Sequence, residues 1–250
     1  MDKSKNNDLK MPDPISEHLV MTLNKRGPVS SYLDDYAKQF IEFAVQQKSP
    51  ILELGAAYGF VTIAALKAGA TIIANDIEPR HLQILYNRTP EDCRGRLTLL
   101  PGEFPYELNL APESIAGCYV SRMLGYLEPP ALQEGIQKLF LWLKSGAKLF
   151  ILASPPYRAL YKSIIPIYEQ RIKDNEQWPG YFTNLKTLVE EPINRYVPDR
   201  LHFLDDKILS REVERVGFIV EKAELYARKD LPEKAQYDGR EGVAIIARKP

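Results

Sequence analysis

The 250-residue chain lacks several features that would place it in a specialised class of protein. It has only two cysteines, Cys93 and Cys118, which show neither metal-ligand spacing nor a disulfide framework. No run approaches the roughly 20 apolar residues that a membrane-spanning helix needs. Residues 1–10 are polar and of mixed charge, without the apolar core of a signal peptide. We therefore expect no metal site, no membrane segment and a cytoplasmic location.

Neither sign of charge is in excess, since 33 lysines and arginines balance 33 aspartates and glutamates. Proteins dedicated to nucleic-acid binding usually carry a basic surplus. The balance argues against nucleic acid as a partner, although it leaves room for a local basic patch. Hydrophobic residues make up 45% of the chain, and its length fits one large α/β domain.

Short apolar runs alternate with segments of helical periodicity along most of the chain. Five runs before residue 155 are predicted as buried strands, at 51–54, 71–74, 97–100, 115–120 and 148–152. Two further strand-like runs come near the end of the chain, at 218–226 and 242–248. Helices are predicted before and between them, the first at a capping box of Ser31 and Asp34. This alternation predicts a mostly parallel sheet with helices on both faces.

A glycine-bearing turn, from Glu53 to Gly59, follows the first predicted strand. Glycines let a backbone approach a ligand closely, and ligands of open α/β sheets sit at the carboxyl ends of the strands. Asp76 ends the second strand, 21 residues after Gly55, where its carboxylate can accept two hydrogen bonds from a ribose. Together these features predict a nucleoside site. The alternative is that the glycines only form the turn and Asp76 only caps a helix.

The glycine spacing discriminates between nucleoside ligands. A dinucleotide site requires G-x-G-x-x-G, but the second and third glycine positions hold Ala57 and Phe60. The pattern E-x-G-x-x-x-G instead resembles motif I of class I S-adenosylmethionine-dependent methyltransferases. The resemblance covers residues 30–153 and 206–249. It implies S-adenosylmethionine as cofactor, S-adenosylhomocysteine as product, and an α/β fold with a seven-stranded, mostly parallel, doubly wound sheet that closes in a C-terminal antiparallel hairpin.

The resemblance also implies which residues hold the cofactor. The expected cofactor-binding residues are Glu53, Gly55, Ala56, Gly59, Asp76, Ile77, Glu103, Phe104, Ser121 and Arg122. Among these, Asp76 matches the acid that binds the ribose, and Ile77 the apolar residue beside adenine. Glu103 and Phe104 follow the third strand, where the family contacts the adenine amino group. This chain departs from the family at Ala57, where many members carry a third glycine.

Residues 155–205 form an aromatic-rich insertion after the fifth strand, predicted to be mainly helical and to act as a substrate cap. Five candidate acceptor-binding residues lie in it: Tyr157, Tyr161, Trp178, Tyr181 and His202. His202 and Tyr157 are also the candidate general bases. Alternatively, the aromatics form a small subdomain of their own. Residues 1–30 are predicted as a tail that could act as a lid, and 31–250 as one methyltransferase domain.

We therefore expect a methyltransferase that acts on an unidentified acceptor, with a small molecule favoured. The alternatives are a methyltransferase for protein or RNA, and an inactive cofactor-fold binding protein. The string from Ser154 to Tyr157 resembles the N-P-P-Y motif of amino-group methylation, but it follows the fifth strand rather than the fourth. We interpret it as a turn into the insertion. The oligomeric state stays open.

Overall fold

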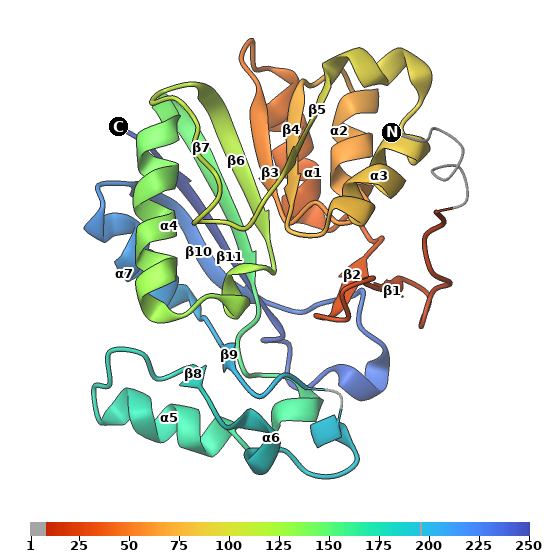
Figure 1. Ribbon diagram of the computed structural model, residues 1–250. Helices are drawn as coiled ribbons and strands as arrows, with labels where there is room; N and C mark the ends of the chain where they lie inside the picture. Colours follow the sequence, from red (N-terminus) through yellow and green to blue (C-terminus); the bar gives the residue numbers. More distant parts are fainter. Residues whose placement is uncertain (1–8, 196) are drawn as a thin grey trace. The chain divides into compact units, whose positions relative to one another are not determined.

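The computed structural model describes residues 9–195 and 197–250, so residues 1–8 of the predicted tail lie outside the described part (Figure 1). Seven strands form a mixed sheet with the order β10-β11-β7-β6-β3-β4-β5. This confirms the predicted α/β fold with its seven-stranded, mostly parallel sheet. The chain divides into two compact units, one ending at Asn109 and the other running from Leu110 to Pro250.

Three parallel strands form the sheet of the first unit: β3 (Ile51–Leu54), β4 (Ile72–Asp76) and β5 (Leu97–Pro101). All four residues of β3 are buried, as its continuous apolar run predicts. Helices α2 (Phe60–Lys67) and α3 (Pro79–Arg88) pack against β4, and α1 (Asp35–Val45) packs on α2. A 3-10 turn, η1 (Glu91–Arg96), leads into β5.

The first helix begins differently from the prediction. Asp34 is itself the N-cap, because its Oδ1 accepts a hydrogen bond of 2.9 Å from the amide of Ala37. Ser31 lies outside the helix, where its hydroxyl donates to the carbonyl of His18. The predicted capping box is therefore wrong: the carboxylate caps the helix alone.

An N-terminal hairpin of β1 (Leu19–Met21) and β2 (Pro28–Ser30) lies within the segment predicted as a tail. It belongs to the first unit and packs on it, because the Tyr58 hydroxyl donates to the Met21 carbonyl at 2.8 Å. Val20, Tyr58 and Ile84 form a small buried cluster beneath it. The sequence pattern predicts no strand here.

The second unit is built on four strands. β6 (Ile115–Ser121) and β7 (Leu143–Ala153) are parallel, whereas β11 (Gly242–Arg248) is antiparallel to both β7 and β10 (Ile219–Tyr226). The predicted closing hairpin is thereby confirmed. Strand β7 begins at Leu143 rather than Lys148, across a register shift opposite Ile115 and Gly117. The helical elements are η2 (Leu124–Tyr126), α4 (Pro129–Trp142), α7 (Asp206–Arg215) and η5 (Glu233–Ala235).

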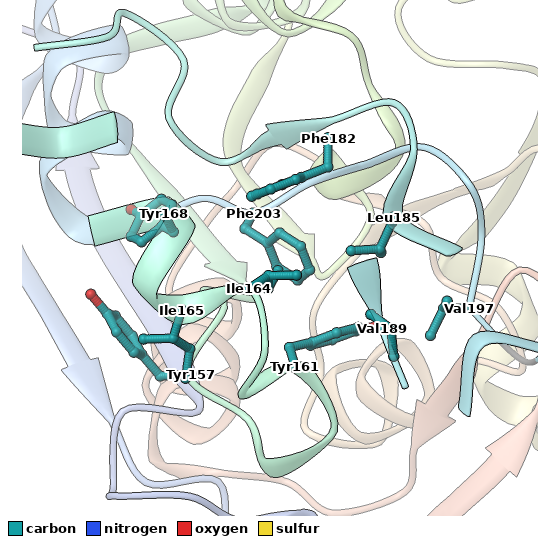
Figure 2. Packing of buried hydrophobic residues seen from close by; sticks show 10 residues of the cluster. All are labelled: Tyr157, Tyr161, Ile164, Ile165, Tyr168, Phe182, Leu185, Val189, Val197 and Phe203. Carbon is teal, nitrogen blue, oxygen red and sulfur yellow. The ribbon is translucent and has the colours of Figure 1, made fainter. Parts of the chain in front are cut away.

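The insertion is mainly helical, as predicted, and forms a core of its own. It contains η3 (Ala159–Tyr161), α5 (Ile165–Lys173), β8 (Tyr181–Phe182), α6 (Leu185–Leu188), η4 (Ile193–Arg195) and β9 (Leu201–His202). Figure 2 shows its buried aromatic and aliphatic side chains packed together. The Tyr168 hydroxyl donates at 2.6 Å to Asp205, the residue that also caps α7. One carboxylate at the end of the insertion therefore links α5 to the first turn of α7.

Candidate functional site

The turn between β3 and α2 has the backbone of a ligand-binding turn. Gly55, Ala57 and Gly59 all have positive φ, at 72°, 46° and 76°. Glycine adopts this region without strain, whereas for an L-residue such as Ala57 the conformation costs about 1 kcal/mol or more. The left-handed geometry at Ala57 is one that glycine adopts without strain, which fits the third glycine of the motif that this turn resembles.

Gly59 is required at its position for a second reason. A Cβ atom there would lie 2.4 Å from Cγ of Leu85, a fully buried side chain on α3. The absence of a side chain lets α2 begin directly against α3, with Gly59 as the N-cap. The final glycine of the motif therefore fixes where the turn ends.

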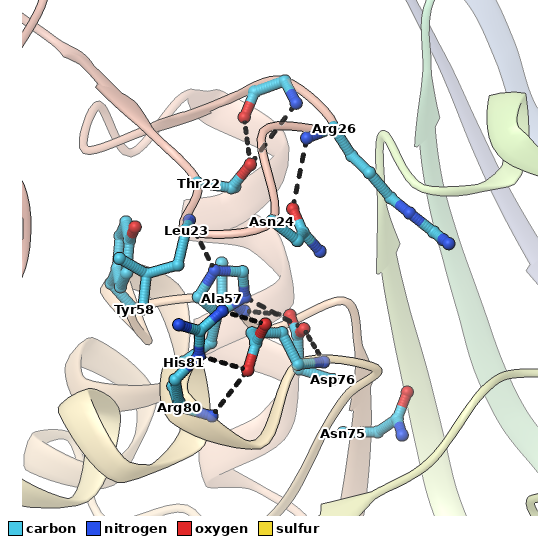
Figure 3. Close-up of polar contacts among 12 residues, drawn as sticks. Thr22, Leu23, Asn24, Arg26, Ala57, Tyr58, Asn75, Asp76, Arg80 and His81 are labelled. Atoms are coloured by element: carbon cyan, nitrogen blue, oxygen red, sulfur yellow. Dashed lines mark hydrogen bonds and ion pairs between the residues drawn. The ribbon is translucent and has the colours of Figure 1, made fainter.

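The carboxylate of Asp76 is bonded to the turn and buried, with 6% of the residue exposed. Its Oδ2 accepts from the amide of Ala57 at 2.8 Å, and its Oδ1 accepts from the amide of Glu78 at 2.9 Å (Figure 3). The Oδ1 atom also lies 3.0 Å from Nδ1 of His81. A carboxylate offers about four acceptor positions. One position, on Oδ2, is therefore left for a ligand hydroxyl, so the expected pair of hydrogen bonds to a ribose is reduced to one.

His81, on α3, contacts Asp76, and the sequence pattern gave no sign of this role. It is 1% exposed, and both of its ring nitrogens are bonded. The amide of Leu23 donates to its Nε2 at 2.9 Å, so Nδ1 carries the proton and donates to Asp76. Figure 3 shows the resulting chain of contacts from the hairpin loop through His81 to Asp76.

Glu53, the first residue of the motif, is 3% exposed and lies near the end of β3. The hydroxyl of Thr62 donates to its Oε2. Burial raises the pKa of Glu53 to about 7, and the neighbouring charge of Asp76 acts in the same direction. At neutral pH this carboxyl is poised between its two protonation states, and a bound cation would drive it to the ionised form.

Asn75, near the end of β4, holds the loop after β5 by hydrogen bonds. The sequence pattern did not indicate this role of Asn75. Its amide donates to the carbonyls of Leu100 and Gly102 at 2.8 and 2.9 Å. The two expected adenine-contacting residues of this loop lie in the same unit as Asp76. Phe104 is buried and Glu103 is partly buried, as is Ile77 beyond β4.

The other predicted cofactor-binding residues belong to the second unit. Arg122 follows β6 with a positive φ of 55°, and its guanidinium donates to Ser121 Oγ at 3.2 Å and to Tyr226 Oη at 3.0 Å. A contact of Ser121 and Arg122 with the cofactor stays a prediction.

His202 lies on β9 with two of the other predicted acceptor-binding residues around it. The centroid of its ring lies 5.3 Å from the ring centroid of Trp178 and 5.4 Å from that of Tyr181. It is 2% exposed; its Nδ1 lies 3.2 Å from the Leu127 carbonyl, and its Nε2 has no hydrogen-bond partner in the described chain. Burial lowers the pKa of His202 to about 4. The ring is therefore neutral at pH 7, with Nε2 able to accept a proton.

Tyr157 and Tyr161 are members of the insertion core (Figure 2). The guanidinium of Arg240 covers the Tyr157 ring, 3.6 Å from its centre. Burial raises the pKa of the Tyr157 hydroxyl, so this phenol keeps its proton at neutral pH. That state favours His202 over Tyr157 as a general base.

Two kinds of feature are absent from the described residues. In residues 9–195 and 197–250, no cluster of three or more histidine, cysteine, aspartate or glutamate side chains could hold a metal ion. In the same ranges, every helix is too short or too polar to cross a membrane.

Neither a protein-family model nor a curated protein sequence matches this chain. Solved structures do match it. An S-adenosylmethionine-dependent methyltransferase from Methanosarcina mazei superposes with a TM-score of 0.63 at 18% identity, covering 84% of this chain and 96% of that one. One from Mesorhizobium loti gives 0.60 at 18% identity, covering 87% and 100%. The glycopeptide N-methyltransferase MtfA, in complex with S-adenosylmethionine, gives 0.57 at 17% identity, covering 86% and 87%.

These likenesses define the class of fold. The strand order, the antiparallel closing strands and the superpositions show that the chain has the fold of class I S-adenosylmethionine-dependent methyltransferases. This is the fold that the resemblance at motif I implied.

Proposed function

We propose that this chain is an S-adenosylmethionine-dependent methyltransferase. The observation that carries the proposal is the joining of two sequence-distant elements: the Asp76 carboxylate accepts from the amide of Ala57, inside the left-handed turn. This bond fixes both parts of the expected nucleoside site to one another. Solved structures of the same fold include one that binds this cofactor, which supports the same assignment.

In this proposal each part of the first unit has a role. The turn from Gly55 to Gly59 holds the methionine portion, and Oδ2 of Asp76 accepts from a ribose hydroxyl. Ile77, Glu103 and Phe104 border the adenine. Glu53 ionises beside the ammonium group of the cofactor. Because the pKa of its carboxyl is raised to about 7, cofactor binding depends on pH near neutrality. When bound, S-adenosylmethionine supplies an electrophilic methyl group on its sulfonium.

For the acceptor we propose a small molecule that is recognised by the second unit. The balanced overall charge and the aromatic residues Trp178 and Tyr181 beside His202 support this choice. His202 is proposed to accept a hydrogen bond from the acceptor through Nε2, which has no partner in the described chain, and its lowered pKa makes it a weak base at most. Both cysteines are buried and neither forms a disulfide, which fits a reducing compartment, so we propose the cytoplasm.

Calorimetric titration of the full chain with S-adenosylhomocysteine, and with NADH as control, tests the proposal. We expect saturable binding of the first ligand and none of the second, since the dinucleotide glycines are missing. Absence of S-adenosylhomocysteine binding would contradict the proposed cofactor and favour the inactive binding protein.

A further inference from the structure

Three arginines of the second unit gather at one end of its sheet. Strand β10 runs in the same direction as β6 and β7, because β11 is antiparallel to both of its neighbours. Arg122, Arg158 and Arg228 each follow the carboxyl end of one of these three strands. Ligands of open α/β sheets bind at this end.

The surrounding residues hold this arginine cluster in place. Gly242 makes room for it, since a Cβ there would lie 2.6 Å from Cζ of Tyr226 and 3.0 Å from Cγ of Arg228. Tyr226 in turn accepts from Arg122, as described above. Arg228 is 5% exposed and forms a bidentate ion pair with Asp230. The cluster is therefore held by specific packing and hydrogen bonds, unlike a set of unrelated surface side chains.

The nearby acidic groups are already engaged. The Glu241 carboxylate accepts from the amides of Tyr237, Asp238 and Gly239 at 2.8–3.0 Å, and from that of Arg228 at 3.3 Å. Burial lowers the pKa of Arg228 to about 10, and the charges of Arg122 and Arg158 act in the same direction despite Asp230. The bond of Arg122 to Tyr226, and the contact between the 3-10 turns η3 and η5 that come after Arg158 and Arg228, hold the three segments at the same end of the sheet.

Arg158 has unmet bonding capacity. Its Nε is buried and has no hydrogen-bond partner among the residues that the structure describes. Its guanidinium carbon lies 5.9 Å from the centre of the Tyr161 ring, at the edge of the distance for a cation–π contact. A buried donor without an acceptor destabilises the protein unless a ligand supplies the acceptor.

We propose that Arg122, Arg158 and Arg228 bind an oxyanion, either a carboxylate or a phosphate, carried by the methyl acceptor. The planar guanidinium fork matches both groups, and an anion would relieve the mutual repulsion of the cluster. That the bound molecule is the acceptor rests on the proposed methyltransferase function. The oxyanion site itself can be tested without the cofactor.

The test titrates the full chain with inorganic phosphate and, separately, with malonate, at constant ionic strength and followed by calorimetry. Arg158→Gln is the test variant, because its loss leaves the Arg228–Asp230 pair intact. Arg195→Gln, which replaces an exposed arginine of the insertion, is the matched control. We expect saturable binding of at least one anion, weakened about tenfold or more by Arg158→Gln and unchanged by Arg195→Gln.

The outcomes distinguish the two kinds of oxyanion and test whether the site exists. Binding of phosphate alone identifies a phosphorylated acceptor, and binding of malonate alone a carboxylic acid. Absence of binding by both anions, or equal binding in both variants, overturns the proposal. Titration of the original chain and of the Arg158→Gln variant with S-adenosylhomocysteine separates the oxyanion site from the proposed methyltransferase function. Anion binding by a chain that does not bind S-adenosylhomocysteine would keep the oxyanion site and reject the methyltransferase.

Discussion

Glu53 is almost completely buried near the end of β3, just before the turn that we propose holds the methionine portion of the cofactor. Its folded-state pKa of about 7 lies above the ordinary value of 4.5. The folded protein therefore retains a proton that the unfolded chain releases, and stability is lost as the pH rises through this interval.

Glu53→Gln should remove this pH dependence. We expect the variant to gain stability relative to the original chain between pH 5 and 8, by roughly 2–3 kcal/mol in total, at about 1.4 kcal/mol for each pKa unit. Urea unfolding at both pH values measures this. Glu91→Gln, which replaces an exposed glutamate, is the control and should show no such change. An equal stability difference at both pH values would refute the raised pKa of Glu53.

His81 makes two bonds that can be separated by substitution. An asparagine at this position would place an amide nitrogen near the position of Nδ1 and keep the bond to Asp76, whereas a glutamine would keep an acceptor for the Leu23 amide. We expect His81→Asn to bind S-adenosylhomocysteine nearly as well as the original chain, and His81→Gln to bind about tenfold more weakly. Calorimetry distinguishes the two. The reverse order would show that the hairpin contact, rather than the bond to Asp76, matters for the ligand.

At the scale of elements, the turn after β3 contains one residue under strain. Ala57→Gly should leave stability unchanged or raise it by up to about 1 kcal/mol, because relief of the left-handed alanine offsets the added freedom of the unfolded chain. Ala56→Gly, next to it and without a positive φ, should cost about 1 kcal/mol. Thermal unfolding of both variants tests this pair. Equal losses would contradict the left-handed conformation at Ala57.

The elements that the sequence predicted best are those with a strong apolar pattern. Strands β3 and β11 have the expected bounds, because buried strands tolerate few alternatives. The hairpin of β1 and β2 was missed, since strands of three residues show no measurable alternation. The bond of Asp76 to His81 was missed because it depends on the angle at which α3 leaves the strand, which no spacing reveals.

At the scale of the whole molecule, the fold and the glycine turn of the first unit were predictable from the sequence, and an acceptor site was not. Binding of the proposed cofactor would constrain only a few residues at the ends of two strands, such as Gly55, Gly59 and Asp76. The acceptor differs from one methyltransferase to another, so no shared pattern marks its site. The insertion core and the arginine cluster depend on contacts between residues far apart in the chain, which became visible only in the fold.

The central claim is that Asp76 binds the ribose of S-adenosylmethionine. The most direct measurement compares S-adenosylhomocysteine with its 2′,3′-dideoxy analogue, titrated into the original chain and into Asp76→Ala. We predict that the original chain prefers the natural ribose by about tenfold or more, and that Asp76→Ala binds both ligands equally weakly. An equal preference for the natural ribose in both proteins would contradict the claim.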